Sequence, residues 1–276
     1  MTAVWLDGAL VPADEARVSV FDHGFTVGDG VFETVKATGG RPFALGRHLD
    51  RLRRSADRLG LTVPATDRAL REAVDAVLAA AGHDRARLRI SVTSGVTPLG
   101  SGRSESRPTL VVVAGPLAQW PPETTAVTVP WPRNERSAVT GAKTTSYAEN
   151  VVALSEARKV GAGEAIMPNT RDELCEGTST NVFVVLDGRL VTPPLLSGCL
   201  PGVTRALVLE EVPGADEETI PMAALAGAAE VLLTSSTRDV QPLRQLDGLD
   251  LPGADGPFAR RAAAAIADLQ ARDLDP

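Results

Sequence analysis

The chain has 276 residues, of which 43% are hydrophobic and 23% are charged, and its formal net charge at pH 7 is −7. This length and composition are typical of one large globular domain or two smaller ones, each with a buried core. The net negative charge, with acidic and basic residues interspersed along the chain, disfavours nucleic acid or an anionic membrane as the main partner.

The chain has two cysteines, Cys175 and Cys199, which show neither a disulfide framework nor the spacing of a metal-binding pair. The first residues lack a basic flank followed by an apolar run, and no segment approaches the ~20 apolar residues that cross a bilayer. We therefore expect a cytoplasmic protein with no metal site and no membrane partner.

The first half of the chain predicts strands and helices in alternation. Leucines recur at helical spacing after Leu45, whereas Leu88, Ile90 and Val92 alternate with polar residues, as in a half-buried strand. The predicted elements are a hairpin at Asp7-Gly8, a turn-rich stretch at 22–30, a strand at 31–37, helices at 45–60 and 67–82, and strands at 87–93 and 109–114. The last of these is apolar throughout, which predicts a strand covered on both faces.

Residues 116–123 are the best candidate for a linker, because their prolines disfavour both helix and central strand. We therefore expect an N-terminal α/β domain at 1–115 and a C-terminal domain at 124–276. The elements predicted in the second half are strands at 124–130, 165–167 and 231–233, helices at 147–160 and from Gly202, and a hairpin about Asp187-Gly188.

Lys143 is the first candidate for a catalytic residue. Of the 28 Lys and Arg residues only Lys36, Lys143 and Lys159 are lysines, so this chain uses arginine wherever a positive charge suffices. A lysine retained among Gly, Ala, Thr and Ser residues is poorly explained as a surface charge. Unlike arginine, a buried lysine can lose its proton and form a Schiff base, although a lysine placed there by chance is the simpler explanation for one residue alone.

Other residues carry signals that become specific only together. The helix that begins at Gly202 has unpaired backbone amides at its start, which can form an anion-binding site. Residues 234–237 are four hydroxyl residues at the end of a buried strand, although such runs are usually polar turns. His48 and Arg51 are neighbours on the predicted helix 45–60, which also carries solvated arginines, and Glu176 lies among small residues. A lysine, a carboxylate and several phosphate-binding groups are what pyridoxal 5′-phosphate (PLP) requires.

At these residues the chain resembles the fold-type IV, or class IV, PLP enzymes, which include branched-chain and D-amino-acid aminotransferases, (R)-amine transaminases and aminodeoxychorismate lyases. The resemblance covers nearly the whole chain and follows blocks in a fixed order: 28–33, 48–52, Lys143, 176–183, 202–205 and 234–237. It implies an α/β (α+β) fold of two domains, with PLP in the cleft between them and a homodimer whose second subunit completes the site.

The resemblance also implies residue roles. Lys143 would form the Schiff base and carry the proton, and Glu176 would pair with the pyridine nitrogen. The implied phosphate ligands are Arg51, the backbone amides of Val203 and Thr204, and Ser236, and Thr237 would help to bind a substrate carboxylate. Phe32 and Arg89 are further candidates for contact with the substrate. His48 is expected to support Arg51.

Three departures concern the substrate. The tyrosine that branched-chain enzymes place five residues after the lysine is Ala148 here, although Tyr147 precedes it. The tyrosine of the D-amino-acid enzymes' first strand is Phe32, and their carboxylate-binding arginine corresponds to Ser94. Arg89, on the polar face of the same predicted strand, is the nearest substitute or else a surface arginine.

The first functional hypothesis is an aminotransferase that moves an amino group between an amino acid, with D-isomers included, and a 2-oxo acid. The second is an aminodeoxychorismate lyase that produces 4-aminobenzoate and pyruvate. An (R)-amine transaminase and an inactive binding scaffold are weaker alternatives, the scaffold because both Lys143 and Glu176 are present.

Overall fold

The computed structural model describes residues 3–276, which divide between two units. Of these residues, unit 1 comprises 3–118, 142–146 and 274–276, and unit 2 comprises 119–141 and 147–273. The first division falls after Ala118, inside the stretch 116–123 that the prolines single out. Unit 1 also contains two short segments from later in the chain, and one of them includes Lys143.

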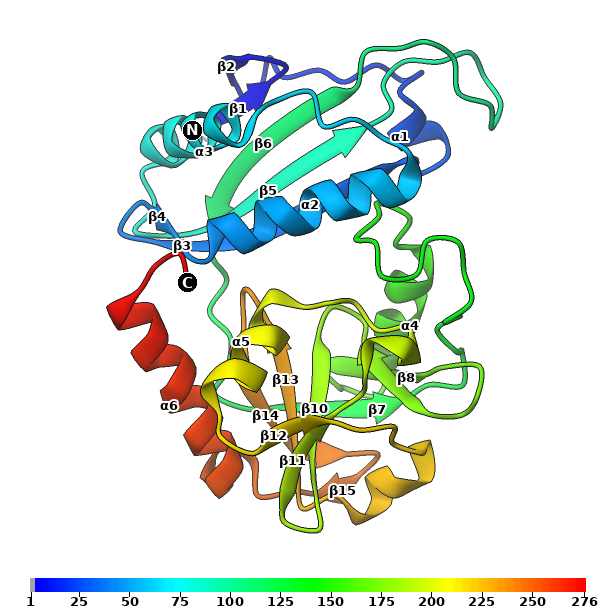
Figure 1. The fold of residues 1–276 in the computed structure, drawn as a ribbon, viewed down its shortest axis with the longest axis vertical. Coiled ribbons are helices and arrows are strands. Elements are labelled where there is room, and N and C mark those ends of the chain that lie inside the picture. Colours follow the sequence, from blue (N-terminus) through cyan, green and yellow to red (C-terminus); the bar gives the residue numbers. More distant parts are fainter. Residues whose placement is uncertain (1–2) are drawn as a thin grey trace. The chain divides into compact units, whose positions relative to one another are not determined.

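Unit 1 is built on a six-stranded sheet in the order β2-β1-β6-β5-β3-β4 (Figure 1). Asp7, at φ 47°, and Gly8 form the turn of the first hairpin, as the sequence predicts. The strands are β1 (Ala3–Leu6), β2 (Ala9–Pro12), β3 (Gly30–Thr38), β4 (Arg41–Pro42), β5 (Arg85–Thr93) and β6 (Thr109–Pro116). Their hydrogen-bonded neighbours are all antiparallel.

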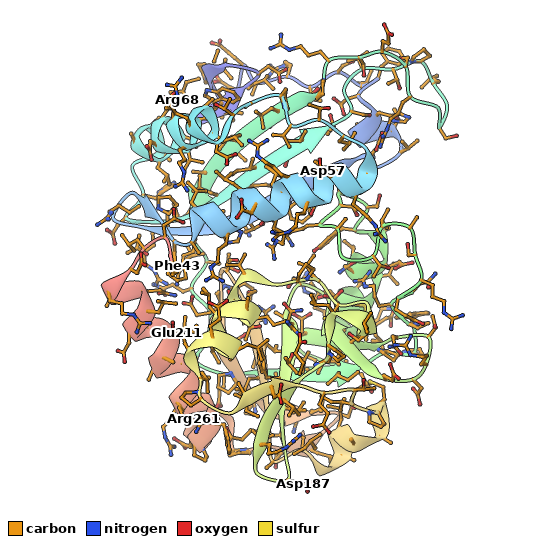
Figure 2. All side chains as sticks on the ribbon, viewed as in Figure 1. Phe43, Asp57, Arg68, Asp187, Glu211 and Arg261 are labelled. Atoms are coloured by element: carbon orange, nitrogen blue, oxygen red, sulfur yellow. The ribbon has the colours of Figure 1, made fainter. Side chains whose placement is uncertain are left out.

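Two helices, α2 (Leu45–Leu59) and α3 (Asp67–Ala81), pack their apolar faces against this sheet. The sequence predicts both within a residue or two. Thr66 caps α3 by accepting the N–H of Ala69, and Gly60 and Gly82 end the two helices in the left-handed conformation that glycine adopts without strain. Asp57 lies on the exposed face of α2, away from this core (Figure 2).

Burial alternates along β5 and β6. Along β5, Leu88, Ile90 and Val92 are buried, as predicted. The expectation that residues 109–114 are covered on both faces is wrong, because Val111 and Val113 remain partly exposed. The helices pack against one face of the sheet only, so an apolar run did not indicate two covered faces.

Unit 2 contains a nine-stranded sheet in the order β12-β11-β10-β13-β14-β7-β8-β9, with β15 paired to β14. Its strands are β7 (Thr124–Thr128), β8 (Glu164–Pro168), β9 (Leu174–Gly177), β10 (Asn181–Leu186), β11 (Arg189–Thr192), β12 (Ala215–Glu217), β13 (Glu230–Ser235), β14 (Asp239–Leu246) and β15 (Leu249–Asp250). The predicted hairpin between β10 and β11 turns at Asp187, which Figure 2 shows at its tip.

Three α-helices belong to unit 2: α4 (Ala148–Lys159), α5 (Val203–Glu211) and α6 (Pro257–Arg272). The carboxylate of Glu230, at the start of β13, caps α6 by accepting the N–H groups of Phe258 and Ala259. The remaining helical pieces are α1 (His23–Thr26) in unit 1 and the 3₁₀ turns Leu195–Ser197, Met222–Gly227 and Gly253–Asp255 in unit 2. No helix within residues 3–276 is long and apolar enough to cross a membrane.

Candidate active site

The segment that carries Lys143 lies along β3 of unit 1. Thr144 forms an antiparallel bridge with Val31, and the N–H of Thr145 donates to the carbonyl of Gly30 at 2.8 Å. The N–H of Phe32 donates to the carbonyl of Lys143 at 2.9 Å. The backbone of the lysine is therefore held by the strand.

Two glycines allow this close approach. Gly28 has φ +72°, and a Cβ there would lie 2.5 Å from Oγ of Ser146. A Cβ on Gly30 would lie 2.9 Å from the carbonyl oxygen of Val92 and 3.1 Å from Oγ1 of Thr145. Gly28 and Gly30 thus leave room for the lysine segment to dock beside β3.

The side chains of three predicted residues meet beside β3. Nζ of Lys143 lies 4.5 Å from the centroid of the Phe32 ring, and Cζ of Arg89 lies 3.7 Å from the same centroid. Nε of Arg89 also donates to Oγ of Ser91 at 3.1 Å. Phe32 is buried, Lys143 is half-buried and Arg89 is exposed. Both basic side chains therefore lie within cation–π distance of one aromatic ring.

Arg51 lies in a buried ionic cluster that the sequence did not reveal. Its Nε and Nη2 donate to the two carboxylate oxygens of Glu33, each at 2.7 Å, and Nδ1 of His48 donates to Oε2 of Glu33 at 2.7 Å. All three side chains are buried. As expected, His48 supports Arg51, but it does so through a carboxylate on β3.

The cluster sets the charge of its members. Burial alone would favour the neutral acid, yet the neighbouring Arg51 guanidinium and His48 hold the pKa of Glu33 well below its usual range. Burial and the Arg51 charge lower the pKa of His48, against the attraction of Glu33. At neutral pH the cluster is therefore an Arg51–Glu33 ion pair beside a neutral histidine.

Glu176 occupies the end of β9 in unit 2, with both carboxylate oxygens oriented. Oε1 accepts from Nε of Arg133 at 3.0 Å, and Oε2 accepts from the backbone N–H of Leu200 at 2.9 Å. Arg133 was not predicted, because it stands in an irregular stretch between Pro132 and Asn134 with no periodic pattern. These two hydrogen bonds fix the orientation of the Glu176 carboxylate.

The start of α5 is tied to the same region. The carbonyl of Leu200 accepts from Nδ2 of Asn181 at 2.8 Å, and a Cβ on Gly202 would lie 2.0 Å from Oδ1 of Asn181. A larger residue before Val203, which begins the helix, would have to displace the Asn181 side chain. Asn181 pairs with Thr234 across β10 and β13, and the buried Oγ1 of Thr234 has no hydrogen-bond partner within residues 3–276.

The other predicted residues take less specific positions. Val203 and Thr204 form the first turn of α5 and are buried. Ser236 and Thr237 are half-buried in the turn between β13 and β14. Ser94 is buried beyond the end of β5, and its N–H donates to the carbonyl of Asp29 at 3.2 Å.

Comparisons with known proteins identify the family of the chain. Residues 30–246 match the amino-transferase class IV family. A D-alanine aminotransferase from Staphylococcus haemolyticus is 30% identical over 273 residues, which are 95% of this chain and 95% of the relative.

Solved structures are similar over almost the full length. The branched-chain aminotransferase of the archaeon Thermoproteus uzoniensis, solved with norvaline, has a TM-score of 0.91 and 31% identity, and the match covers 98% of this chain and 95% of that one. The branched-chain aminotransferase of Escherichia coli has a TM-score of 0.89 and 27% identity, with coverage of 97% and 94%. A third branched-chain amino acid aminotransferase, solved with N-(5′-phosphopyridoxyl)-L-glutamate, has a TM-score of 0.88 and 27% identity, with coverage of 98% and 95%. This chain, with its two sheets and their helices in an α+β fold, therefore belongs to the class IV aminotransferases.

Proposed function

We propose that the chain uses PLP to move an amino group between an amino acid and a 2-oxo acid. When bound, PLP supplies an electron sink that lets a proton leave the α-carbon of an amino acid. The observation that carries the proposal is the placement of Lys143, whose backbone is fixed along β3 while its amine projects beside the Phe32 ring. An amine held in this way can form a Schiff base and can then carry the proton.

The residues present fit the phosphate of PLP. The first turn of α5 exposes backbone amides at Val203 and Thr204, behind a glycine that no other residue could replace without displacing Asn181. The unpartnered Oγ1 of Thr234 marks a place where a hydrogen-bonding group is expected. Arg51 and Ser236 complete the donor set that we propose.

Glu176 would hold the proton at the pyridine nitrogen. Nε of Arg133 and the N–H of Leu200 donate to its two carboxylate oxygens and keep the carboxylate in one orientation. Arg133 and Leu200 thus hold the Glu176 carboxylate in a fixed orientation, as the ring nitrogen of PLP requires of its partner. One of the similar branched-chain enzymes was solved with a phosphopyridoxyl compound, which supports the same cofactor here.

Glu176→Gln is expected to retain PLP but to lower kcat at least ~100-fold, because a neutral amide does not stabilise a protonated ring nitrogen. Steady-state kinetics of PLP-loaded protein measure this effect. The matched control is Glu149→Gln, since Glu149 also pairs with Arg133, at 3.4 Å, but is exposed. A Glu176→Gln enzyme with the kcat of the control would place the carboxylate elsewhere.

We propose an amino acid as donor, with D-isomers among the candidates, since the relatives include both D-alanine and branched-chain aminotransferases. Its carboxylate needs a partner in a poorly hydrated site. Arg89 is the cation that lies on the same aromatic ring as Lys143, so we assign it to the substrate carboxylate, with Thr237 as a second contact.

Arg89→Ala is expected to raise KM for the amino acid by about 10- to 100-fold, on the scale of a lost charged hydrogen bond. PLP affinity should stay unchanged. Arg87→Ala is the control, because Arg87 is exposed on the same face of β5 two residues earlier. If both variants give the wild-type KM, Arg89 is a surface arginine.

The function is tested by half-reactions of the PLP-loaded protein. D- and L-amino acids, (R)-amines and aminodeoxychorismate are added separately, and the absorbance of the bound cofactor is followed. A donor that bleaches the band, with recovery on adding a 2-oxo acid, supports the aminotransferase. The relatives named above do not favour the lyase, which would instead release 4-aminobenzoate and pyruvate without an amino acceptor. A band that no donor changes would contradict the proposal.

We also propose a homodimer. Exposed apolar side chains gather on residues 18–27 and 95–99, which are joined by hydrogen bonds from the N–H of His23 to Gly95 and of Thr97 to Phe21. They include Phe25 and Leu99, which are 74% and 77% exposed. Exposed apolar surface of this kind is typical of protein interfaces. Sedimentation equilibrium tests the proposal by measuring whether the protein has the mass of one chain or of two.

We also propose a cytoplasmic location, which fits the two free cysteines.

A further inference from the structure

Ser55 contacts the lysine segment from a helix far away in the sequence. It is 2% exposed and lies on the buried face of α2, one turn after Arg51. Its hydroxyl oxygen accepts the backbone N–H of Lys143 at 3.0 Å. A buried helical serine commonly bonds within its own helix, so a bond to a residue 88 positions later is a specific tertiary contact.

Both peptide groups that flank the α-carbon of Lys143 are thereby fixed. Ser55 binds the N–H on one side, and the N–H of Phe32 binds the carbonyl on the other. The direction in which the side chain leaves the backbone then depends on two neighbours, one on α2 and one on β3. Small errors in the placement of a reacting group cost large factors in rate.

The same helix holds Arg51, which is tied to β3 through Glu33. Arg51 and Ser55 are four residues apart and therefore lie on one face of α2. One helical turn therefore connects Arg51, which is bonded to Glu33 on β3, with Ser55, which is bonded to the Lys143 backbone.

We propose that Ser55 is a positioning residue for Lys143, through which α2 fixes the lysine relative to Arg51. This inference rests on the proposed role of Lys143. Its effect is on the geometry of the lysine rather than on cofactor affinity. Loss of the Ser55 hydroxyl should therefore lower kcat while leaving KM and the Kd for PLP unchanged.

The small number of lysines makes the contact measurable by itself. Protein labelled with ¹⁵N-lysine gives backbone amide signals from Lys36, Lys143 and Lys159 only. Lys36→Arg and Lys159→Arg assign them by elimination. In Ser55→Ala the Lys143 amide is expected to exchange with solvent about 3- to 10-fold faster, as for one lost hydrogen bond. The other two amides should keep their wild-type rates, and kcat should fall about tenfold.

Thr66→Ala is the control for a general loss of stability. It removes the cap of α3 in the same unit, at an expected cost similar to that of one hydrogen bond, without touching the lysine segment. It should leave the exchange of the Lys143 amide and kcat unchanged. Ser55→Cys provides a second variant of similar size, with sulfur as a poor acceptor, in case the alanine variant does not fold.

Two results overturn the inference. One is exchange of the Lys143 amide in Ser55→Ala and Ser55→Cys at the wild-type rate, which would mean that the hydrogen bond does not hold in solution. The other is faster exchange with unchanged kcat, which would make the contact structural only. A wild-type protein that binds no PLP would instead contradict the proposed function, and the exchange measurement would still report on the bond.

Discussion

Lys143→Ala is expected to lower the rate of transamination at least ~1,000-fold, because it removes the amine that we propose both bonds to the cofactor and carries the proton. The fold should be retained, since the segment is held along β3 by backbone groups that alanine also has. PLP is still expected to bind through its phosphate. Single-turnover kinetics and circular dichroism measure the two properties separately.

Lys159→Ala is the matched control. Lys159 ends α4, is exposed and pairs with Glu156, so its loss should leave the rate unchanged. Lys36 is buried and packs over Phe43, which makes it a poorer control. A Lys143→Ala protein that keeps its activity would require another amine as the nucleophile, and Lys36 would then be the remaining candidate in unit 1.

Glu33→Gln is expected to lower the free energy of unfolding by about 3–5 kcal/mol, because removing one partner of a buried ion pair leaves an uncompensated charge. An amide can accept from only one nitrogen of Arg51 and presents N–H groups to the other donor. Denaturant unfolding of the cofactor-free protein measures the loss, which is a large part of the stability of an ordinary domain.

The control for Glu33 is Glu72→Gln, which breaks the Arg68–Glu72 pair on the exposed face of α3. A pair of that kind contributes at most about 1 kcal/mol, so the control should unfold almost as the wild type does. Equal destabilisation by the two changes would show that the Arg51–Glu33 pair does not exist in solution.

The Glu33 effect should also depend on pH. The pKa of Glu33 is lowered in the folded protein, so its stabilising contribution is fully present above the unfolded value of about 4.3. As the pH falls below that value, the contribution is progressively lost. The wild type and Glu33→Gln should therefore converge in stability in acid, whereas a gap independent of pH would indicate a packing effect.

The sequence predicted the regular elements of unit 1 because their periods are clear. Leu45, Leu49 and Leu52 mark one face of α2, and the alternation about Leu88 marks one face of β5. Glycines and Thr66 set the ends of the helices. A local sequence pattern does not show whether one face of a sheet or both faces are covered by helices. The partial exposure of Val111 and Val113 on β6 was therefore not predicted.

Candidate site residues were found where their chemistry is rare, and missed where it depends on tertiary contact. Lys143 stands out in a chain that otherwise prefers arginine. Glu33 gave a signal that could have been used, since it lies two residues from both Val31 and Val35 and so points to the core face, where a carboxylate needs partners. That Arg51 and Ser55 reach β3 and Lys143 follows only from the docking of α2 on the sheet.

The return of residues 142–146 to β3 has a consequence for the order in which the protein can fold during its synthesis. When the chain has emerged from the ribosome as far as residue 118, all six strands of the first sheet are available, but the segment that lies along β3 has not yet emerged. The partner groups on Gly30, Phe32 and Ser55 must then wait for residues 88 or more positions away. Contacts of such long range form late. Lys143 should therefore dock on β3 after the six strands of unit 1 have formed, when synthesis has already entered unit 2.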